Sequence, residues 1–314
     1  MEKMLLEIVL IVVSIAVVLW GADRFTDGAS GLARRLKVSE LVIGLTVVAL
    51  GTSLPEFMVS FMSVLRGSAD MSVGNIIGSN VFNILVILGA SAMMRPMVVE
   101  NTLLRRDLPI CLAASVLLVV FAFTSGLIAR WEGLLLVVFF CGYLFMAYRI
   151  AMKDRKGAAD EVREEKTPLL KLVLLILVGM AALVVGGRVL VDNAASVAHQ
   201  LGVSESVIGM TILAGGTSLP ELATSVVAAR KGSLGLAFGN VVGSNVFNIA
   251  FVIGSCSSIV PMAVTEITML DWCMLVGSVV LVWIVSFTRR TIVFREGLLL
   301  VLCYLSYLTW LIIR

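Results

Sequence analysis

Long apolar stretches recur along the whole chain and are separated by short polar segments. Examples run from Leu5 to Trp20, from Leu41 to Leu65, from Leu134 to Tyr148 and from Leu298 to Ile313. A helix of about 20 apolar residues crosses the hydrocarbon core of a bilayer and satisfies its own backbone hydrogen bonds there. The pattern therefore predicts an all-α membrane protein.

Composition supports this class. The 314 residues are 60% apolar and 14% charged, whereas a soluble domain is about half apolar and a quarter charged.

The first apolar stretch resembles a cleavable signal, since Lys3 precedes it. Glu7 interrupts that stretch, however, and residues 169–185 form an equivalent one later in the chain. We therefore interpret the first stretch as a retained transmembrane helix.

The chain repeats itself at an offset of 165 residues. SELVIGLTVVALGTSLPE at 39–56 corresponds to SESVIGMTILAGGTSLPE at 204–221, and GNIIGSNVFNILVILG at 74–89 to GNVVGSNVFNIAFVIG at 239–254. Such self-similarity indicates two copies of one structural unit. The expected organisation is a first five-helix repeat at 1–148 with its motif region at 39–89, a polar linker at 149–171, and a second five-helix repeat at 172–314 with its motif region at 204–254.

Each copy is expected to contain five spans. In the first copy they lie at 4–20, 41–65, 72–93, 108–125 and 131–148. An odd number of spans inverts the second copy, which gives ten transmembrane helices in two inverted five-helix repeats. With both termini outside, 19 of the 24 Lys and Arg residues fall in cytoplasmic loops, as basic residues prefer. We expect a multi-pass plasma-membrane protein with a cytoplasmic linker.

Two glutamates stand in otherwise apolar spans. Glu56 and Glu221 each follow the residues Gly-Thr-Ser-Leu-Pro. A carboxylate in lipid costs several kcal/mol, so it should face a partner, a cavity or an ion. Proline removes a backbone donor and glycine loosens a helix, so helices 2 and 7 should break there. Two such breaks, brought together by the repeat, would form one cage of oxygen atoms suited to a hard cation.

The spans after the glutamates carry polar and small residues at helical spacing. A serine and an asparagine four residues apart share one helical face, and glycines four apart allow close helix packing. The polar pairs are Ser79 with Asn83 and Ser244 with Asn248, and the glycines are Gly74, Gly78, Gly239 and Gly243. The polar pairs could contact an ion, join helices, or do both. Asp27 and Asp192 also recur at equivalent positions. Helix capping near the membrane interface and a role in ion entry explain this recurrence equally well.

The paired GTSLPE and GN(I/V)(I/V)GSNVFN motifs resemble the two alpha-repeats of the calcium/cation antiporter superfamily, and nearly all of the chain is similar to a prokaryotic sodium/calcium exchanger. The resemblance implies a secondary active antiporter, not an enzyme, that exchanges sodium for calcium by alternating access without a cofactor. The expected partners are Na+, Ca2+ and the lipid bilayer, with no nucleic acid, and the expected functional unit is a monomer.

The resemblance also implies metal contacts for twelve residues. They are Glu56, Glu221, Thr52 and Thr217 for calcium, Ala49, Ser53, Ser79, Ala214, Ser218 and Ser244 for flanking sodium ions, and Asn83 and Asn248 in the middle of the site. Some members of the superfamily, including the potassium-dependent exchangers, carry Asp where this chain has Asn248. The asparagine therefore argues against potassium dependence.

Three alternatives remain at this point. A proton-coupled cation exchanger of the same superfamily tends to carry an acid where Asn83 and Asn248 stand. An intramembrane hydrolase would need a histidine or lysine base near a serine, and neither residue type lies beside the motif serines Ser53 and Ser218. A channel would move ions without a counter-ion. The first and sixth spans of this chain lack motif residues. If the chain is an antiporter, these two spans are expected to move against the helices that hold the ion.

Overall fold

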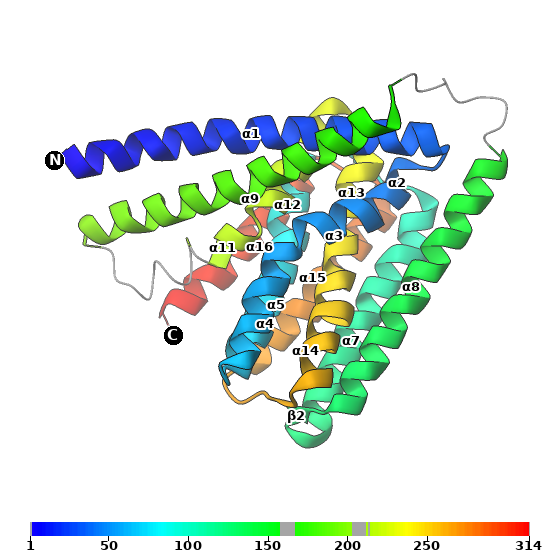
Figure 1. Cartoon of the computed structure of the whole chain (residues 1–314). Helices are drawn as coiled ribbons and strands as arrows, with labels where there is room; N and C mark the ends of the chain where they lie inside the picture. The colour runs from blue at the N-terminus through cyan, green and yellow to red at the C-terminus, as the bar shows by residue number, and fades with distance from the viewer. Residues whose placement is uncertain (1, 158–166, 203–211, 213, 314) are drawn as a thin grey trace.

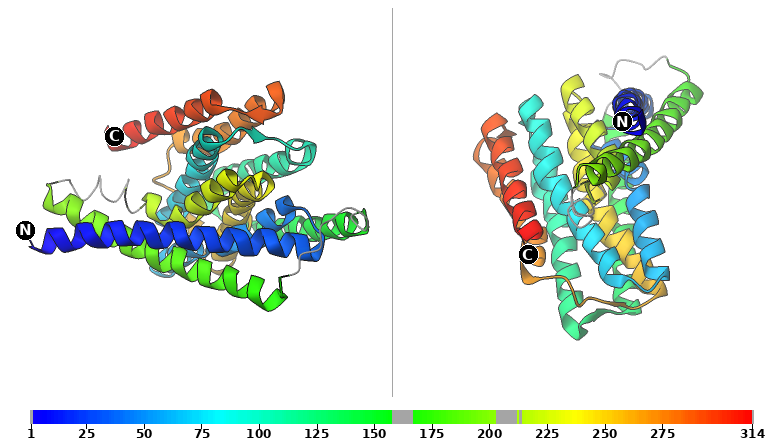
Figure 2. Two further views of the ribbon diagram at one scale, coloured as in Figure 1. Left: turned by 90° about the horizontal axis from the view of Figure 1, so that it is seen from above. Right: turned by 90° about the vertical axis from the view of Figure 1, so that its left-hand side faces the viewer.

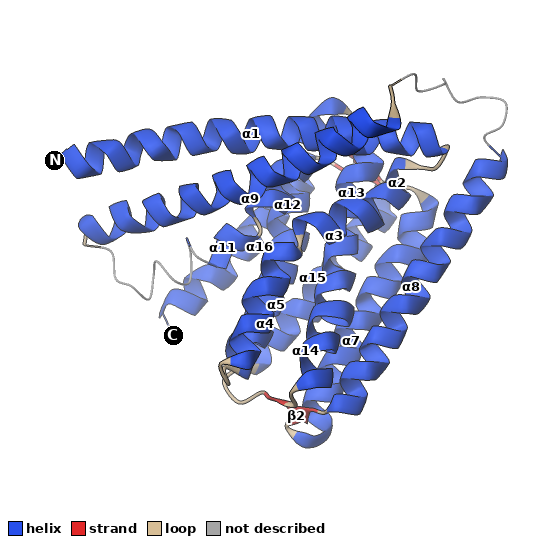
Figure 3. Cartoon of the chain, viewed as in Figure 1, coloured by secondary structure: helices blue, strands red, loops and turns tan. Residues whose placement is uncertain are grey.

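The computed structural model describes residues 2–157, 167–202, 212 and 214–313. These residues are almost entirely helical (Figure 3). They contain eight helices long and apolar enough to cross a membrane, or nine if one bent pair is counted as a span. The all-α membrane class is thus confirmed. Residues 203–211 and 213, which include the beginning of the seventh expected span, lie outside the described residues.

The elements of the first half lead from α1 to α8 (Figure 1). They are α1 (Glu2–Leu36), α2 (Glu40–Ile43), the π-helical segment η1 (Gly44–Val48), α3 (Ala49–Thr52), α4 (Leu54–Leu65), α5 (Ala69–Phe82), η2 (Asn83–Ile87), α6 (Leu88–Met94), β1 (Met97–Val98), η3 (Leu103–Asp107), α7 (Leu108–Ser125), β2 (Leu127–Ile128) and α8 (Arg130–Gly157).

The second half follows the same order. Its elements are α9 (Leu169–Gln200), α11 (Ala214–Thr217), α12 (Leu219–Lys231), α13 (Leu234–Val246), η5 (Phe247–Ile253), α14 (Gly254–Ile259), β3 (Met262–Ala263), α15 (Met269–Arg289), β4 (Thr291–Ile292) and α16 (Phe294–Ile313). Strand β1 pairs antiparallel with β4, and β2 with β3. Each short ladder therefore joins one half of the chain to the other.

The long helices α1 and α9 lie side by side on one face of the bundle, crossing the other helices (Figures 1 and 2). They run antiparallel, because Glu7 near the start of α1 accepts hydrogen bonds from Ser196 and Gln200 near the end of α9. A Cβ atom on Gly21 would lie 2.9 Å from the carbonyl oxygen of Gly179. Only glycine permits this backbone approach.

These two helices are longer than the sequence suggested. The first span was expected at 4–20, but α1 has 35 residues and α9 has 32. Asp27 and Asp192 lie inside the two helices. The capping interpretation of these acids was therefore wrong. The fifth span likewise extends past 148, because α8 continues to Gly157.

The helical span that carries Glu56 is bent. The segments Glu40–Thr52 and Leu54–Leu65 meet at 46°, and Ser53 between them has φ −88° and ψ 8°. Pro55 follows in the first turn of α4, where its missing N–H costs no helical hydrogen bond. Ser218 has nearly the same backbone angles, φ −87° and ψ 8°, between α11 and α12. The two motifs thus have the same local conformation.

The motif helices form the centre of the molecule. In the most apolar stretch of Leu234–Ile259, 94% is buried, compared with 22% in α1 and 28% in α9. Gly239 and Gly243 explain the tight packing, since a Cβ atom on either would lie 2.6 Å from the carbonyl oxygen of Leu41 or Leu45 respectively. The expected close approach is confirmed for these two glycines. The partners that the repeat assigns to Gly74 and Gly78 lie near 206–210, outside the described residues.

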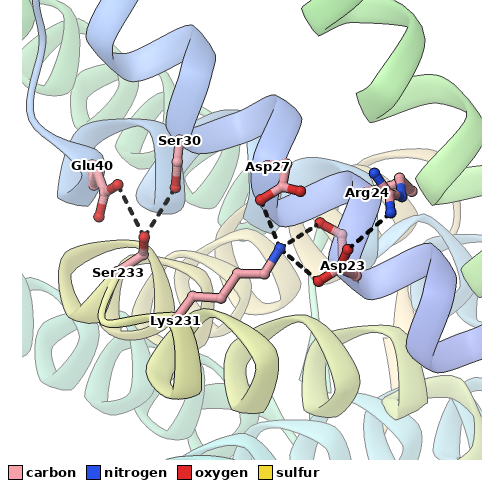
Figure 4. A network of polar contacts seen from close by, with 7 residues as sticks. All are labelled: Asp23, Arg24, Asp27, Ser30, Glu40, Lys231 and Ser233. Atoms are coloured by element: carbon pink, nitrogen blue, oxygen red, sulfur yellow. Dashed lines mark hydrogen bonds and ion pairs between the residues drawn. The ribbon is translucent and has the colours of Figure 1, made fainter.

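A polar cluster holds α1 to the end of α12 (Figure 4). The Nζ atom of Lys231 lies 2.6 Å from a carboxylate oxygen of both Asp23 and Asp27. Ser233, in the turn that follows, lies 3.1 Å from the Ser30 hydroxyl and donates to Glu40 at 3.1 Å. The long helix pair is thus attached to the central helices by ionic and hydroxyl contacts at this end.

We expect Gly243→Ala to destabilise the protein, because the added methyl would meet Leu45 backbone and the Ala49 side chain at 2.6 and 2.8 Å. Overpacking of this kind costs about 1–3 kcal/mol. The measurement is the thermal unfolding midpoint in detergent. Gly142→Ala is the control, since among the described residues no atom outside its own helix backbone lies within 4 Å of a Cβ there. Equal midpoints for the two variants would contradict the prediction.

Candidate ion-binding site

The two sequence-predicted glutamates meet at the centre of the molecule. Glu56 and Glu221 lie in the first turns of α4 and α12, directly after the two breaks, and are 1% and 0% exposed. The two carboxyl groups lie beside each other's motifs, because Glu56 accepts a hydrogen bond from Ser218 and Glu221 accepts one from Ser53. Each also lies near a helix N-terminus, whose partial positive charge stabilises an anion. The breaks therefore place two acids together in an otherwise apolar interior.

Serines connect the two motifs in a crossed pattern. Ser218 precedes Glu221 but donates a hydrogen bond to Glu56 Oε1 at 3.0 Å. Ser53 precedes Glu56 but donates to Glu221 Oε1 at 2.7 Å. Ser79 of α5 also approaches Glu56 Oε1, at 3.3 Å, and lies 2.8 Å from the Ser218 hydroxyl. Each acid is thus held by the motif of the other half of the chain.

Several buried oxygen atoms at this centre have no hydrogen-bond partner among the described residues. They are Glu56 Oε2, Glu221 Oε2, Asn83 Oδ1, Asn248 Oδ1 and Ser244 Oγ. The first four form two pairs related by the repeat. A buried polar group without a partner costs several kcal/mol, and a carboxylate costs more. Carboxylate, amide and hydroxyl oxygens are the ligands that hard cations prefer, so this arrangement is suited to binding one.

The remaining predicted residues surround this centre. Thr52 is buried, and its hydroxyl lies 3.1 Å from the Val48 carbonyl and 3.0 Å from Asn240 Oδ1. Ala49 is buried in α3, and its carbonyl accepts from the Ser53 backbone at 3.1 Å. Thr217 ends α11 and is half-buried. Ala214 begins α11.

The sequence reasoning missed two asparagines that support the glutamate backbones. Asn240 donates to the carbonyl of Glu221 at 3.3 Å and to Ser225 Oγ at 2.9 Å. Asn75, its equivalent, donates to the carbonyl of Glu56 at 3.5 Å and to Ser60 Oγ at 3.0 Å. A signal was available, because both pairs recur at the 165-residue offset.

Helices that can cross a membrane and that enclose two buried acids define a multi-pass membrane protein with a polar centre. Residues 6–149 and 171–313 match the family described as sodium/calcium exchanger protein. The chain belongs to this family, which confirms the resemblance seen in the motifs.

Individual relatives agree with the family. The chain is 37% identical over 265 residues to the putative antiporter CaxA of Alkalimonas amylolytica, covering 82% of each protein. It is 32% identical over 326 residues to the sodium/calcium exchanger MaX1 of Methanosarcina acetivorans, covering 92% of this chain and 93% of MaX1. A solved structure of the sodium-calcium exchanger NCX_Mj, soaked with zero Na+ and Ca2+, matches with a TM-score of 0.84 and 29% identity over 98% of this chain and 99% of that one.

Proposed function

We propose that the chain is a secondary active antiporter that exchanges sodium for calcium across a membrane by alternating access. The observation that carries this proposal is a set of buried carboxylate and amide oxygens, contributed in pairs by the two halves of the chain, that have no hydrogen-bond partner in the described part of the structure. Membership of the sodium/calcium exchanger family supports the choice of ions. An intramembrane hydrolase has no support, because relatives such as CaxA and MaX1 are named as an antiporter and an exchanger.

Calcium takes about 6–8 oxygen ligands at about 2.3–2.6 Å. In this proposal Glu56, Glu221, Thr52 and Thr217 hold calcium. The flanking sodium ions use the main-chain or hydroxyl oxygens of Ala49, Ser53, Ser79, Ala214, Ser218 and Ser244, and the Asn83 and Asn248 oxygens complete the middle. Both ions need the same two carboxylates, so binding of one excludes the other. This competition couples the two fluxes without a cofactor.

The proposed topology has ten helices in two inverted five-helix repeats, 1–148 and 172–314, with helices 2 and 7 broken at the ion site. The 165-residue repeat and the matching backbone angles at Ser53 and Ser218 support it. Both termini lie outside the plasma membrane and the linker 149–171 lies in the cytoplasm, as the distribution of basic residues suggests. A single chain holds both halves of the site, which supports a functional monomer.

The helix pair α1 and α9 is the proposed moving part. At one end of the pair, Glu7 of α1 accepts a hydrogen bond from Ser196 of α9. At the other end, Arg35 of α1 donates to the carbonyl of Thr167, just before α9, at 3.1 Å. Glycine contacts join its middle. With both ends and the middle connected, the two helices would move as one body across the central helices.

The contacts of Lys231 with Asp23 and Asp27 differ from those at the equivalent positions of the other half of the chain. We interpret the Lys231 end as the closed side of the protein and the equivalent end as the open side. By the repeat, the counterparts of Lys231 and Asp27 are Arg66 and Asp192. Asp192 is 65% exposed and lies 3.8 Å from Arg188 of its own helix, and Arg66 forms no ion pair within the described ranges. We infer that movement of the helix pair breaks the Lys231 contact and brings Asp192 toward Arg66.

The test of the function is uptake of radioactive calcium into proteoliposomes containing the purified protein. We expect uptake when the vesicles are loaded with sodium and diluted into sodium-free buffer, because outward sodium flow drives calcium in. Uptake driven by a pH gradient and indifferent to sodium would instead indicate a proton-coupled exchanger. Uptake that needs no counter-ion would indicate a channel.

Glu56→Gln and Glu221→Gln should each abolish calcium exchange. Removing one carboxylate that pairs with a buried cation costs about 2–5 kcal/mol. This cost corresponds to a loss of about 30-fold or more in calcium affinity. Calorimetry and the uptake assay measure the two effects. Glu100→Gln is the control, since Glu100 is exposed outside this centre. Exchange that survives either central substitution would refute the shared site.

Lys231→Met should loosen α1 at the end that contacts α12. An exposed ion pair contributes about 0.2–1 kcal/mol, so we expect amide hydrogen exchange in residues 22–31 to accelerate by up to about fivefold. Arg230→Met removes the same charge from the neighbouring exposed residue and serves as the control. If both variants exchange at the same rate, the Lys231 contact does not hold the helix.

A further inference from the structure

Asn80 and Asn245 form a reciprocal contact between the two halves of the chain. Both are 1% exposed and occupy equivalent positions in α5 and α13. Asn80 Nδ2 donates to the Asn245 backbone carbonyl at 3.2 Å, and Asn245 Nδ2 donates to the Asn80 carbonyl at 3.1 Å. Each lies less than one turn before a π-helical segment, where the regular α-helical hydrogen-bond pattern is interrupted.

This contact fixes which way each amide points. A backbone carbonyl can only accept a hydrogen bond, so the NH2 group of each asparagine must face it. The Oδ1 atoms therefore point elsewhere. Asn80 Oδ1 accepts from Asn248 Nδ2 at 3.1 Å, and Asn245 Oδ1 accepts from Asn83 Nδ2 at 3.0 Å.

The orientation then passes to the asparagines of the proposed ion site. Asn248 and Asn83 each present their NH2 group to the neighbouring amide oxygen, so their own Oδ1 atoms face away from it. Both of these oxygens are buried and have no partner among the described residues. An asparagine without this restraint could turn over and present NH2, whose hydrogens repel a cation.

We propose that Asn80 and Asn245 are positioning residues that fix the amide oxygens of Asn248 and Asn83 toward the transported cation. The proposal rests on the proposed function. The pairing is crossed, because Asn80 acts on Asn248 and Asn245 acts on Asn83. A residue that only joins helices would show no such preference for one partner.

A double-mutant cycle on the purified full chain tests the pairing, with calcium affinity measured by calorimetry. Asn80→Ala should weaken calcium binding about three- to tenfold, the usual effect of losing one buried hydrogen bond. In an Asn248→Ala background the same change should have no further effect, because the group that it orients is absent. In an Asn83→Ala background the full loss should remain. Asn245→Ala should give the mirror result.

The opposite outcomes would overturn the proposal. They are an unchanged affinity in Asn80→Ala, or an equal loss in the Asn248→Ala and Asn83→Ala backgrounds. Asn193→Ala removes an amide that donates to the Val189 carbonyl within α9. It controls for loss of an asparagine and should leave the affinity unchanged. If the parent binds calcium and the glutamate variants do not, a flat cycle would refute this proposal alone and leave the exchange function standing.

An isosteric variant covers the case in which alanine disrupts folding. Asn80→Asp keeps the side-chain shape but loses the donation to the Asn245 carbonyl. Both oxygens of a carboxylate accept hydrogen bonds, so Asn248 Nδ2 still has its acceptor and the orientation of Asn248 should persist. The added negative charge attracts a cation, and we expect calcium affinity at least equal to that of the parent. A loss of three- to tenfold, the size expected for alanine, would contradict the positioning role.

Discussion

Two carboxylates buried together in an apolar interior impose the constraint on which the rest of this structure depends. Glu56 and Glu221 have almost no contact with solvent, and removing a charge from water is costly unless other groups compensate. Hydroxyl groups of Ser53 and Ser218 satisfy one oxygen of each acid. The second oxygen of each has no protein partner among the described residues, and this is the place where we propose that a cation binds.

The turns at Ser53 and Ser218 are suited to that constraint. A continuous helix would direct the serine and glutamate of one motif to its own neighbours, whereas the turn at Ser53 or Ser218 directs the serine to the acid of the other motif. The two halves therefore depend on each other for their hydrogen bonds. Glycines in α13 let the backbones approach closely enough for these short side chains to reach.

The central helices are more deeply buried than the outer helix pair. The central helices are held by buried amides, hydroxyls and glycine contacts, while α1 and α9 are mostly exposed and attached to the centre in part by ion pairs of Lys231. Ion pairs that are partly open to solvent contribute little and can exchange partners at low cost. An assembly of this kind can hold a site in place while the covering helices change position.

The sequence by itself determined the membrane class, the duplication and the identity of the central acids. These are properties of composition and local order: apolar length, a fixed offset, and proline and glycine before each glutamate. It also predicted the close packing at Gly239 and Gly243, because small residues four apart form one helical stripe.

Only the tertiary structure decided how far α1 extends, which serine contacts which acid, and how the amides point. Polar residues such as Asp27 interrupt the apolar pattern, so the sequence gives no sign that α1 continues to Leu36, supported there by contacts with other helices. Asn80 and Asn83 are the same residue type, three positions apart on one helix, so the sequence does not distinguish them. Their roles differ because one faces a backbone carbonyl of the other half and the other faces an amide oxygen. Such donor and acceptor pairings exist only after the two halves have packed together.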